Sequence, residues 1–316
     1  MDHFDSIAVQ TALPYLQLIE CLKHGLKLPI ETPPRSFFAP NNDASCVLIM
    51  PAWKPKEFFG VKLVSVWPSN KDTSLPTVSG VYVLLSCANG MPLAIIDGTE
   101  LTLRRTAAAA ALAASMLARK NSQTLAVLGT GALSVPMVQA HTSVHPFKKI
   151  LIWGRQKANA LSVLADLQKL GIEATYLEDL DATLNQADVI AAVTTATEPF
   201  IHTHSLKPGA HLGLIGAFTP HMSEAEPALM EKAQVFADNR MAVLEKGGEV
   251  YQAIQQGFIS ASNIEGELAE LVSDPSRSWR KNDRAITVFK SVGFASLDLI
   301  AAELVYQSKA NSMRKD

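Results

Sequence analysis

The chain has 316 residues, which is longer than a typical single domain, so its length favours two domains. Hydrophobic residues make up 48% of the sequence and charged residues 18%, a composition typical of globular proteins with a sizeable core. The formal net charge is −2 and the sequence has no long run of Lys or Arg, which argues against a nucleic-acid partner or an anionic membrane surface.

Targeting signals and cysteine spacing point to a reducing compartment. The first residues, MDHFDSIAVQ, do not have the charged-then-apolar pattern of a signal peptide, and the apolar stretch 107–118 is shorter than the roughly 20 residues that span a bilayer. Cys21, Cys46 and Cys87 are odd in number and have no metal or redox spacing. We therefore expect a cytoplasmic protein without a membrane segment, whose thiols are reduced and mostly buried.

The secondary structure expected in the first third of the chain changes twice along the sequence. Residues 1–60 mix short helical and turn signals, whereas 61–97 is rich in β-branched and apolar residues and is expected to form strands. Asn89-Gly90 is a strong hairpin signal, so 80–96 is predicted to be an antiparallel pair. Residues 101–119 are rich in alanine and predict a long helix.

A regular alternation of strands and helices starts at residue 124. The short apolar segments TLAVLG, KKILIWG, GIEATYL, ADVIAAV, AHLGLIG and AQVFAD are separated by helical or loop segments, among them a helix over 156–170. Such alternation indicates βαβ units and a parallel sheet covered on both faces. We therefore predict an α/β fold with a Rossmann-type, doubly wound domain, followed by a final apolar helix formed by residues 281–316.

The first turn of this region, GTGALS, has the spacing of a phosphate-binding loop. Gly129 permits the tight turn, Gly131 lets the backbone approach a pyrophosphate, and Ser134 stands where a third small residue packs helix against strand. Thr130 and Ala132 complete the loop, and the N–H groups at the following helix N-terminus attract phosphate. Although glycines also serve ordinary turns, this turn lies between a strand and a helix, which favours cofactor binding.

The end of the second strand predicts the kind of nicotinamide cofactor. An NAD-selective site has Asp or Glu here to accept hydrogen bonds from the ribose 2′-hydroxyl. The segment KKILIWGRQKANA has no acid and instead carries Arg155 and Lys157. Cations favour a 2′-phosphate, so we expect NADPH as the preferred cofactor, with NADH also accepted. The alternative is that both cations are solvated surface charges.

Several longer motifs are similar to those of the ornithine cyclodeaminase/mu-crystallin family over almost the whole chain. These motifs are PPRSFF, GVKLVSVWPSN, LPTVSGVYVLLS, AIIDGTELTLRRTAAAAALAA, VLGTGA and VFKSVGFASLDL. The resemblance implies a smaller α+β domain for substrate binding and dimerisation, built from 1–118 and about 292–316. It also implies a Rossmann domain over 119–291, an active site in the cleft between the two domains, and a homodimer.

Residue by residue, the resemblance assigns substrate-carboxylate binding to Arg35, Lys62 and Arg105. Two guanidinium groups can hold a small carboxylate in a fixed orientation, and Lys62 adds an ammonium group that can give up a proton. The alternatives are a loop charge at Arg35, a strand-edge charge at Lys62 and a surface helix residue at Arg105. Arg104 matches no ligand of the family and is expected to be solvated.

Phe218 is a departure from the members of the family that cyclodeaminate ornithine. Those members carry an acidic residue after the strand, where this chain has LIGAFTPHM and therefore Phe218. Phenylalanine cannot accept a proton, but it can pack against a compact apolar ring. The GAFTP segment resembles the branch that reduces Δ1-pyrroline-2-carboxylate to L-proline. Thr77 and Ser79 are candidate polar contacts to that substrate, or strand hydroxyls that face solvent.

The other polar residues considered are possible cofactor contacts, a histidine pair and a pair of acids. The resemblance adds Thr194, Lys290 and Ser291 to the expected cofactor contacts, with Lys290 also able to stabilise the start of the last helix. His202 and His204 are expected on one face of a strand, and two ligands do not make a zinc site, so no metal is expected. A further pair of acids at helical spacing is expected to be solvated rather than catalytic: Glu245 and Glu249.

These observations predict an NADPH-dependent enzyme that reduces the C=N bond of a small cyclic imino acid. Lys62 is the candidate acid, because an imine accepts hydride readily only when it is protonated. Alternatives within the enzyme class are a broader ketimine reductase that also takes piperideine-2-carboxylate, an alanine-dehydrogenase-like enzyme and an ornithine cyclodeaminase. The alternative outside it is a non-catalytic, crystallin-like NADPH-binding protein, against which the retained cations argue.

Overall fold

The computed structural model describes residues 1–41, 43, 45–73 and 75–312, and it divides into two compact units. Unit 1 comprises Met1–Thr106 and Phe294–Asp316, and unit 2 comprises Ala107–Gly293. The sequence-based boundaries were 118/119 and about 291/292, so the first lies twelve residues beyond the division observed here. The reason is that helix α3 (Gly98–Leu117) runs without interruption through the division, and a continuous helix carries no boundary signal in its sequence.

Unit 1 is built on one six-stranded sheet. In sheet order its strands are β1 (Asp2–Phe4), β6 (Pro92–Asp97), β5 (Val78–Ser86), β4 (Phe58–Val66), β3 (Cys46–Lys54) and β2 (Ser36–Phe38). β1 joins β6 in parallel, and all other neighbours are antiparallel. The predicted hairpin between β5 and β6 is confirmed, and Gly90 adopts the positive φ of +73° that its turn requires.

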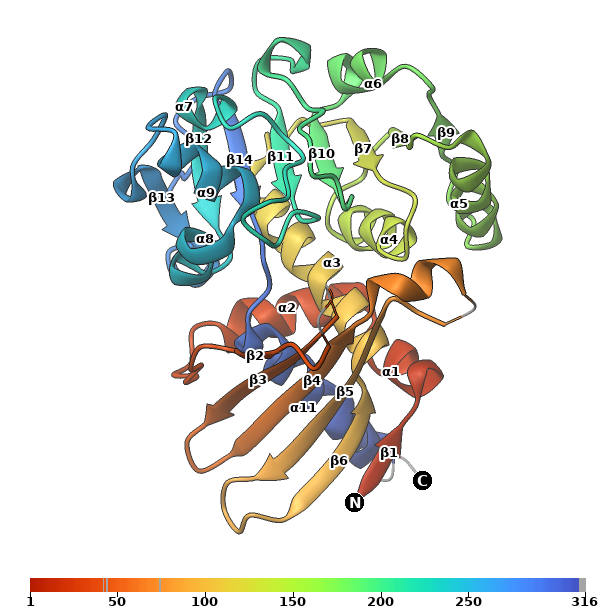
Figure 1. Ribbon diagram of the computed structural model, residues 1–316, viewed down its shortest axis with the longest axis vertical. Helices are drawn as coiled ribbons and strands as arrows, with labels where there is room; N and C mark the ends of the chain where they lie inside the picture. The colour runs from red at the N-terminus through yellow and green to blue at the C-terminus, as the bar shows by residue number, and fades with distance from the viewer. Residues whose placement is uncertain (42, 44, 74, 313–316) are drawn as a thin grey trace. The chain divides into compact units, whose positions relative to one another are not determined.

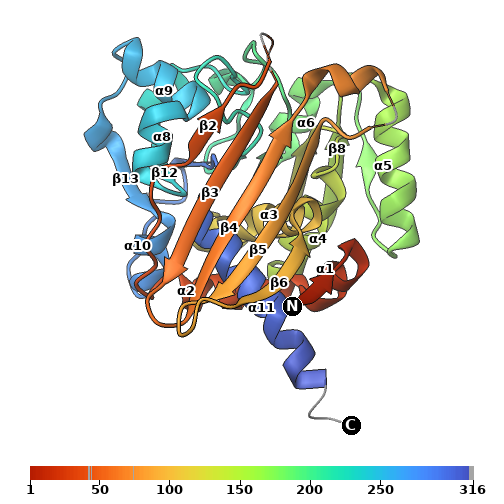
Figure 2. The same cartoon turned by 60° about the horizontal axis from the view of Figure 1, so that its bottom comes forward.

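Helix α11 (Ala295–Ser312) covers one face of this sheet. It packs across β3, β4 and β5, and also against α1 (Ser6–Ala12) and α2 (Tyr15–Gly25) (Figure 2). Gly25 makes the α2 contact possible, because a Cβ atom there would lie 2.8 Å from the side chain of Ile300. The last helix of the chain therefore completes the core begun by the first helices.

Two sequence-based expectations for the elements are wrong. Residues 46–54, placed among helical and turn signals, form the long strand β3, since pairing along the whole of β4 outweighs the strand-breaking Pro51. The segment 281–316 is not one helix, because Ile286–Lys290 forms strand β14 of the other unit before α11 begins at Ala295.

Unit 2 contains an eight-stranded sheet in which every neighbouring pair is parallel. In sheet order the strands are β13 (Ile264–Glu267), β12 (Ala233–Ala237), β14 (Ile286–Lys290), β11 (His211–Leu214), β10 (Val189–Ala192), β7 (Thr124–Leu128), β8 (Lys149–Trp153) and β9 (Thr175–Tyr176) (Figure 1). The chain winds outward from β7 on one side and from β10 on the other. The predicted doubly wound α/β fold is thus confirmed.

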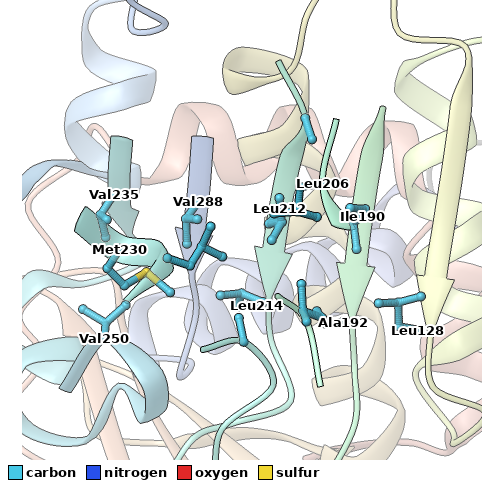
Figure 3. Close-up of a cluster of buried hydrophobic side chains, with 14 of the residues drawn as sticks. Leu128, Ile190, Ala192, Leu206, Leu212, Leu214, Met230, Val235, Val250 and Val288 are labelled. Carbon is cyan, nitrogen blue, oxygen red and sulfur yellow. The ribbon is translucent and has the colours of Figure 1, made fainter. Parts of the chain in front are cut away.

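The middle strands of this sheet are buried on both faces. β10 and β11 have no exposed residue, and Figure 3 shows their side chains beside those of β7, β14 and β12. The connecting helices are α4 (Ser134–Val144), α5 (Lys157–Lys169), α6 (Leu180–Gln186), α7 (Leu229–Lys232), α8 (Arg240–Lys246), α9 (Gly248–Gln255) and α10 (Leu268–Ser273), with short 3-10 turns at Thr203–Ser205 and Ala261–Asn263. A further 3-10 turn, Pro68–Asp72, belongs to unit 1. Burial on both faces explains why these strands are continuous apolar runs in the sequence.

The structure also bears on membrane spans and on the exposure of the three cysteines. Across the described helices, none is long and apolar enough to cross a membrane. Cys46 is buried and Cys21 half-buried, but Cys87 is exposed, so the expectation that the thiols are mostly buried is wrong for Cys87. Cys87 directly follows β5 at the hairpin turn, where the backbone leaves the sheet.

Candidate active site

The turn after β7 has the geometry of a phosphate-binding loop. Gly129 has a φ of +127°, and a Cβ atom there would lie 2.9 Å from the carbonyl oxygen of Val193, so only glycine fits. At Gly131 a Cβ atom would meet nothing within 4 Å, which leaves the backbone open to a ligand. The hydroxyl of Ser134 donates to the carbonyl oxygen of Gly129 at 2.8 Å and ties the turn to the start of α4. Serine at the third small position therefore stabilises the loop.

A cavity of about 430 Å³ opens beside this turn. Its lining residues come from the turn, α4 and α5, and are Thr130, Gly131, Ala132, Val135, Asn159, Ser162, Val163 and Asp166. The cavity lies beside the turn at the carboxyl end of β7, and the strand order reverses between β7 and its neighbour β10, which is where doubly wound sheets bind ligands. The glycine geometry and the open space fit a dinucleotide.

Arg155 and Lys157 follow β8 and are both exposed. The segment Gly154–Lys157 has no acidic residue that could accept from a ribose hydroxyl. The selection of NADPH by Arg155 stays a prediction.

Three charged side chains meet inside unit 1. Lys62 on β4 donates to Asp298 Oδ1 on α11 at 2.8 Å, and Arg105 Nε on α3 donates to the same oxygen at 2.8 Å. All three residues are at most 5% exposed. The alternatives of a strand-edge charge for Lys62 and a surface position for Arg105 are therefore wrong, because β4 lies inside the sheet and α3 is buried here.

The surroundings of this cluster change its acid–base properties. Burial, the nearby Arg105 and, more weakly, Arg35 lower the pKa of Lys62 to about 8, although Asp298 opposes that shift. The cations Arg105 and Lys62 hold the pKa of Asp298 below its usual value despite its burial. Near neutral pH the cluster thus has an ionised carboxylate and a lysine that can release its proton within the physiological range.

Arg104 is buried, in contrast to its expected solvation. It is 6% exposed, donates to the carbonyl oxygen of Leu13 at 3.2 Å, pairs with Glu100 at 3.1 Å and lies over the ring of Tyr15. Arg104 therefore fastens α3 to the N-terminal helices, because adjacent helical residues point in directions about 100° apart.

Thr77 and Ser79 lie at the start of β5 and are both half-buried. Their hydroxyl groups stay candidate substrate contacts. Phe218 lies in the loop after β11 and is 39% exposed, a surface that an incoming ring could cover.

A second buried ionic cluster lies in unit 2, at the carboxyl ends of its strands. Lys290, the last residue of β14, pairs with Glu249 of α9 at 2.8 Å, and both are fully buried. Glu224 is fully buried too, and its backbone N–H donates to Glu249 Oε2 at 3.4 Å. The expectation that Glu249 is solvated is wrong, whereas Glu245 is exposed as expected.

The residues predicted to contact the cofactor are held by this unit's own acids. The N–H of Thr194 donates to Glu224 at 2.6 Å, and the hydroxyl of Ser291 donates to Asp238 at 2.7 Å. Lys290 ends a strand, and its ammonium group is bound to Glu249 rather than placed at a helix start. Direct contact of these three residues with a cofactor stays a prediction.

The histidine pair has a different geometry from the one expected. His202 precedes a 3-10 turn and His204 lies within it, so neither is on a strand; their rings stack at 5.6 Å, and His202 Nδ1 donates a hydrogen bond to Glu226 at 3.0 Å. Within the described ranges, no group of three or more His, Cys, Asp or Glu side chains could hold a metal ion.

Sequence reasoning missed Asp298, Glu224 and Asp238. One signal was available for Asp298, which stands alone in the apolar run FASLDLIAA, because a lone acid on a buried helix face needs a cationic partner. Its partners lie 236 and 193 positions away, which no local pattern reveals.

Comparison with known proteins gives consistent matches over almost the entire chain. The model of the ornithine cyclodeaminase/mu-crystallin family matches residues 7–313. A Δ1-pyrroline-2-carboxylate reductase from Colwellia psychrerythraea is 34% identical over 312 residues, covering 96% of this chain and 98% of that protein. The structure of Thermococcus litoralis Δ1-pyrroline-2-carboxylate reductase with NADH and L-proline is 28% identical, with a TM-score of 0.93 over 99% of this chain and 98% of the other. An archaeal alanine dehydrogenase dimer with bound NAD is 25% identical, with a TM-score of 0.91 over 99% and 97%.

Proposed function

The chain belongs to the ornithine cyclodeaminase/mu-crystallin family and is a nicotinamide-dependent oxidoreductase, and from this premise we propose that it reduces Δ1-pyrroline-2-carboxylate to L-proline. The observation that carries the proposal is the buried cluster of Lys62, Arg105 and Asp298. Two cations face one carboxylate, so one positive charge is in excess and can receive the carboxylate of a small acid.

Arg105 and Arg35 are assigned to binding. A guanidinium group keeps its proton at any working pH, so it can hold a carboxylate but cannot supply a proton. The charge of Arg35 contributes to the lowered pKa of Lys62, which supports assigning both cations to one binding site. Thr77 and Ser79 are proposed to orient the substrate from β5.

Lys62 is assigned to proton transfer. Its pKa of about 8 means that it is mostly protonated at neutral pH and can still give up the proton. A protonated imine carbon is a much better hydride acceptor than a neutral one, and an acid whose pKa is near the working pH is the most effective donor. Asp298 keeps the ammonium group in place through its 2.8 Å hydrogen bond.

The cofactor is proposed to bind along the turn Gly129–Ala132 and the cavity beside it, with NADPH preferred through Arg155. When bound, the nicotinamide supplies the hydride that converts the C=N bond into an amine. The residues of the turn hold the phosphates through backbone N–H groups and the start of α4. Thr194 and Ser291, at the ends of β10 and β14, are proposed to lie near the nicotinamide.

Phe218 favours reduction of a ready-made cyclic imine over cyclodeamination. A phenyl ring can cover a compact apolar ring, but it cannot bind the side-chain amine of ornithine or move a proton. A broader ketimine reductase that also accepts piperideine-2-carboxylate is the second candidate, because Phe218 is partly exposed and could tolerate a larger ring.

We extend the proposal to a cytoplasmic homodimer. In β4 the side chain of Lys62 faces α11, so alternation turns Val61 and Leu63 to the opposite sheet face, where Leu63 is exposed. This face could pair with a second copy, which sedimentation of the 34.1 kDa chain would test.

The deciding experiment is a spectrophotometric panel of substrates with NADPH and with NADH. We expect NADPH oxidation with Δ1-pyrroline-2-carboxylate and no release of ammonia from L-ornithine. Pyruvate with ammonia tests the alanine-dehydrogenase-like alternative, and piperideine-2-carboxylate tests the broader reductase. Rapid conversion of ornithine to proline would refute the proposal, and so would a lack of activity with both imines.

A further inference from the structure

Glu224 joins two loops of unit 2 at the expected nicotinamide end of the sheet. Its Oε1 accepts the N–H of Thr194 at 2.6 Å and the hydroxyl of Thr194 at 3.0 Å. Its Oε2 accepts the N–H of Gly216 at 2.7 Å and more weakly that of Ala217 at 3.4 Å. One carboxylate oxygen therefore holds the loop after β10, and the other holds the loop after β11.

The chain around this contact leaves no room for adjustment. A Cβ atom at Gly216 would lie 2.0 Å from the carbonyl oxygen of Thr194, so the two loops touch backbone to backbone there. A Cβ atom at Gly248 would lie 2.8 Å from the side chain of Ala217, and Gly248 has a φ of +48°. Phe218 comes directly after these fixed residues, so its position depends on them.

Two further buried charges lie next to Glu224. Glu249 approaches its backbone N–H from α9, and Lys290 approaches Glu249 from β14, all three residues being fully buried. Two acids and one cation leave one negative charge in excess, which the donated N–H and O–H groups of the two loops stabilise. A buried carboxylate that accepts several N–H bonds is a strong, directional anchor.

We propose that Glu224 is a positioning residue that sets the distance between Thr194 and Phe218 and thereby selects the ring size of the imine. This inference rests on the proposed function, since Phe218 is the assigned ring contact. Because each loop is bound to a different oxygen of one rigid carboxylate, the separation of the loops is fixed by the width of that group. A six-membered ring needs more room than a five-membered one, so a separation fixed by Glu224 is expected to favour the smaller ring.

Burial and Glu249 raise the pKa of Glu224 to about 7, although Lys290 and the backbone donors act in the opposite direction. The ionised form, which accepts from both loops, is populated above that pKa. The preference for the five-membered imine should therefore be stronger at pH 8 than at pH 6. Comparing two substrates at each pH removes the common effect of Lys62 on the rate.

The test compares Glu224→Gln with Glu226→Gln. Glu226 is a matched control because it lies on the same loop and also accepts an N–H and a hydroxyl, but both come from Thr203 in a 3-10 turn and not from the loop that holds Thr194. A methylene group is worth roughly 10–200-fold in a shaped pocket, so Glu224→Gln should lower the kcat/KM ratio of five- over six-membered imine at least about tenfold and make it independent of pH. Glu226→Gln should keep the wild-type ratio. Equal ratios in the two variants would overturn the proposal.

Amide hydrogen exchange gives a second readout that needs no substrate. Glu224→Gln should speed exchange at Thr194 or Gly216, because an amide group cannot accept on both sides, whereas Glu226→Gln should speed it at Thr203. Unchanged exchange at Thr194 and Gly216 would overturn the positioning role even if the imine assays succeed. If instead neither imine is reduced by the wild type, the proposed function fails, and exchange alone decides whether Glu224 ties the loops. If Glu224→Gln does not fold, Thr194→Val is used instead, because it removes the hydrogen bond from the Thr194 hydroxyl to Glu224. Its kcat/KM ratio of five- over six-membered imine should fall in the same way.

Discussion

The ionic cluster around Asp298 in unit 1 and the one around Lys290 in unit 2 are opposite in composition. In unit 1 a single acid, Asp298, faces Lys62 and Arg105. In unit 2 a single cation, Lys290, lies with two acids, Glu249 and Glu224.

The two clusters also differ in how their excess charge is satisfied. In unit 2 the backbone N–H groups of two loops bind the excess acid, so this cluster is complete within the chain. In unit 1, Asp298 Oδ2 is buried and has no hydrogen-bond partner among the described residues, and the excess charge is positive. A buried cluster whose excess charge is bound by backbone N–H groups therefore stabilises the fold. A buried cluster with an excess cation is suited to bind an anionic ligand.

The sharpest test of this difference is Lys62→Met. If Lys62 supplies the proton, kcat should fall by roughly 10²–10⁴, whereas a role in clamping alone would raise KM and leave kcat nearly normal. Lys54→Met is the matched control, since Lys54 is a buried lysine on the neighbouring strand that also pairs with an acid of α11, Glu303, at 2.7 Å. We expect Lys54→Met to lower stability and spare kcat. A near-normal kcat in Lys62→Met would remove proton transfer from the cluster and leave it as a binding site.

Asp298→Asn should give the next largest effect. Removing the acid leaves two buried cations without their partner, which should cost about 3–5 kcal/mol in the free energy of unfolding. Because Asp298 raises the pKa of Lys62, its loss should move the high-pH limb of kcat/KM from near 8 to lower pH.

The acid side of the stability curve gives an independent check on Asp298. Its pKa is lowered in the folded state, so its contribution to stability is present above the ordinary carboxyl pKa and is lost as the pH falls through the lowered value. Urea denaturation between pH 2 and pH 7 should therefore show that the free energy of unfolding falls less at acid pH in Asp298→Asn than in the wild type. Identical slopes, or a high-pH limb that stays at 8, would argue that Asp298 does not act on Lys62.

Arg155→Asp should give the smallest of these effects, because Arg155 is exposed and belongs to neither cluster. Losing one charge-assisted contact to a phosphate costs about 1.5–3 kcal/mol, or roughly ten- to a hundredfold in affinity. The KM for NADPH should rise by this factor and that for NADH much less. Equal KM changes for both cofactors would show that the arginine side chain points into solvent.

The sequence predicted unit 2 better than unit 1, and the reason is physical. Strands buried on both faces of a parallel sheet are continuous apolar runs, so β7, β10 and β11 are visible locally. β3 is long and partly exposed, contains Pro51 and depends on its pairing with β4. The short strand β14 stands close before α11 and was merged with it, because a run of five apolar and polar residues has no period of its own.

Individual residues of the candidate site could be predicted from the sequence, but their ion-pair partners could not. The glycine turn and the grouping of Lys62 with Arg105 came from motifs, but their acid partner lies on a helix that begins at Ala295. Glu249 was misjudged because its spacing from Glu245 seemed helical. In fact Gly247 separates α8 from α9, so the two acids lie on different helices and only Glu249 points inward. Partners that the fold brings together over such distances cannot be read from local spacing.

The position of α11 along the chain has a consequence for biosynthesis. Unit 1 consists of two segments with the whole of unit 2 inserted between them, and Asp298 lies on the later one. During translation, the ribosome makes Lys62 and Arg105 long before their counter-ion, while all of unit 2 can fold as it emerges. Until α11 has been made, the first segment of unit 1 lacks the counter-ion of Lys62 and Arg105 and the helix that covers one face of its sheet. The protein becomes competent for chemistry only when its last helix leaves the exit tunnel.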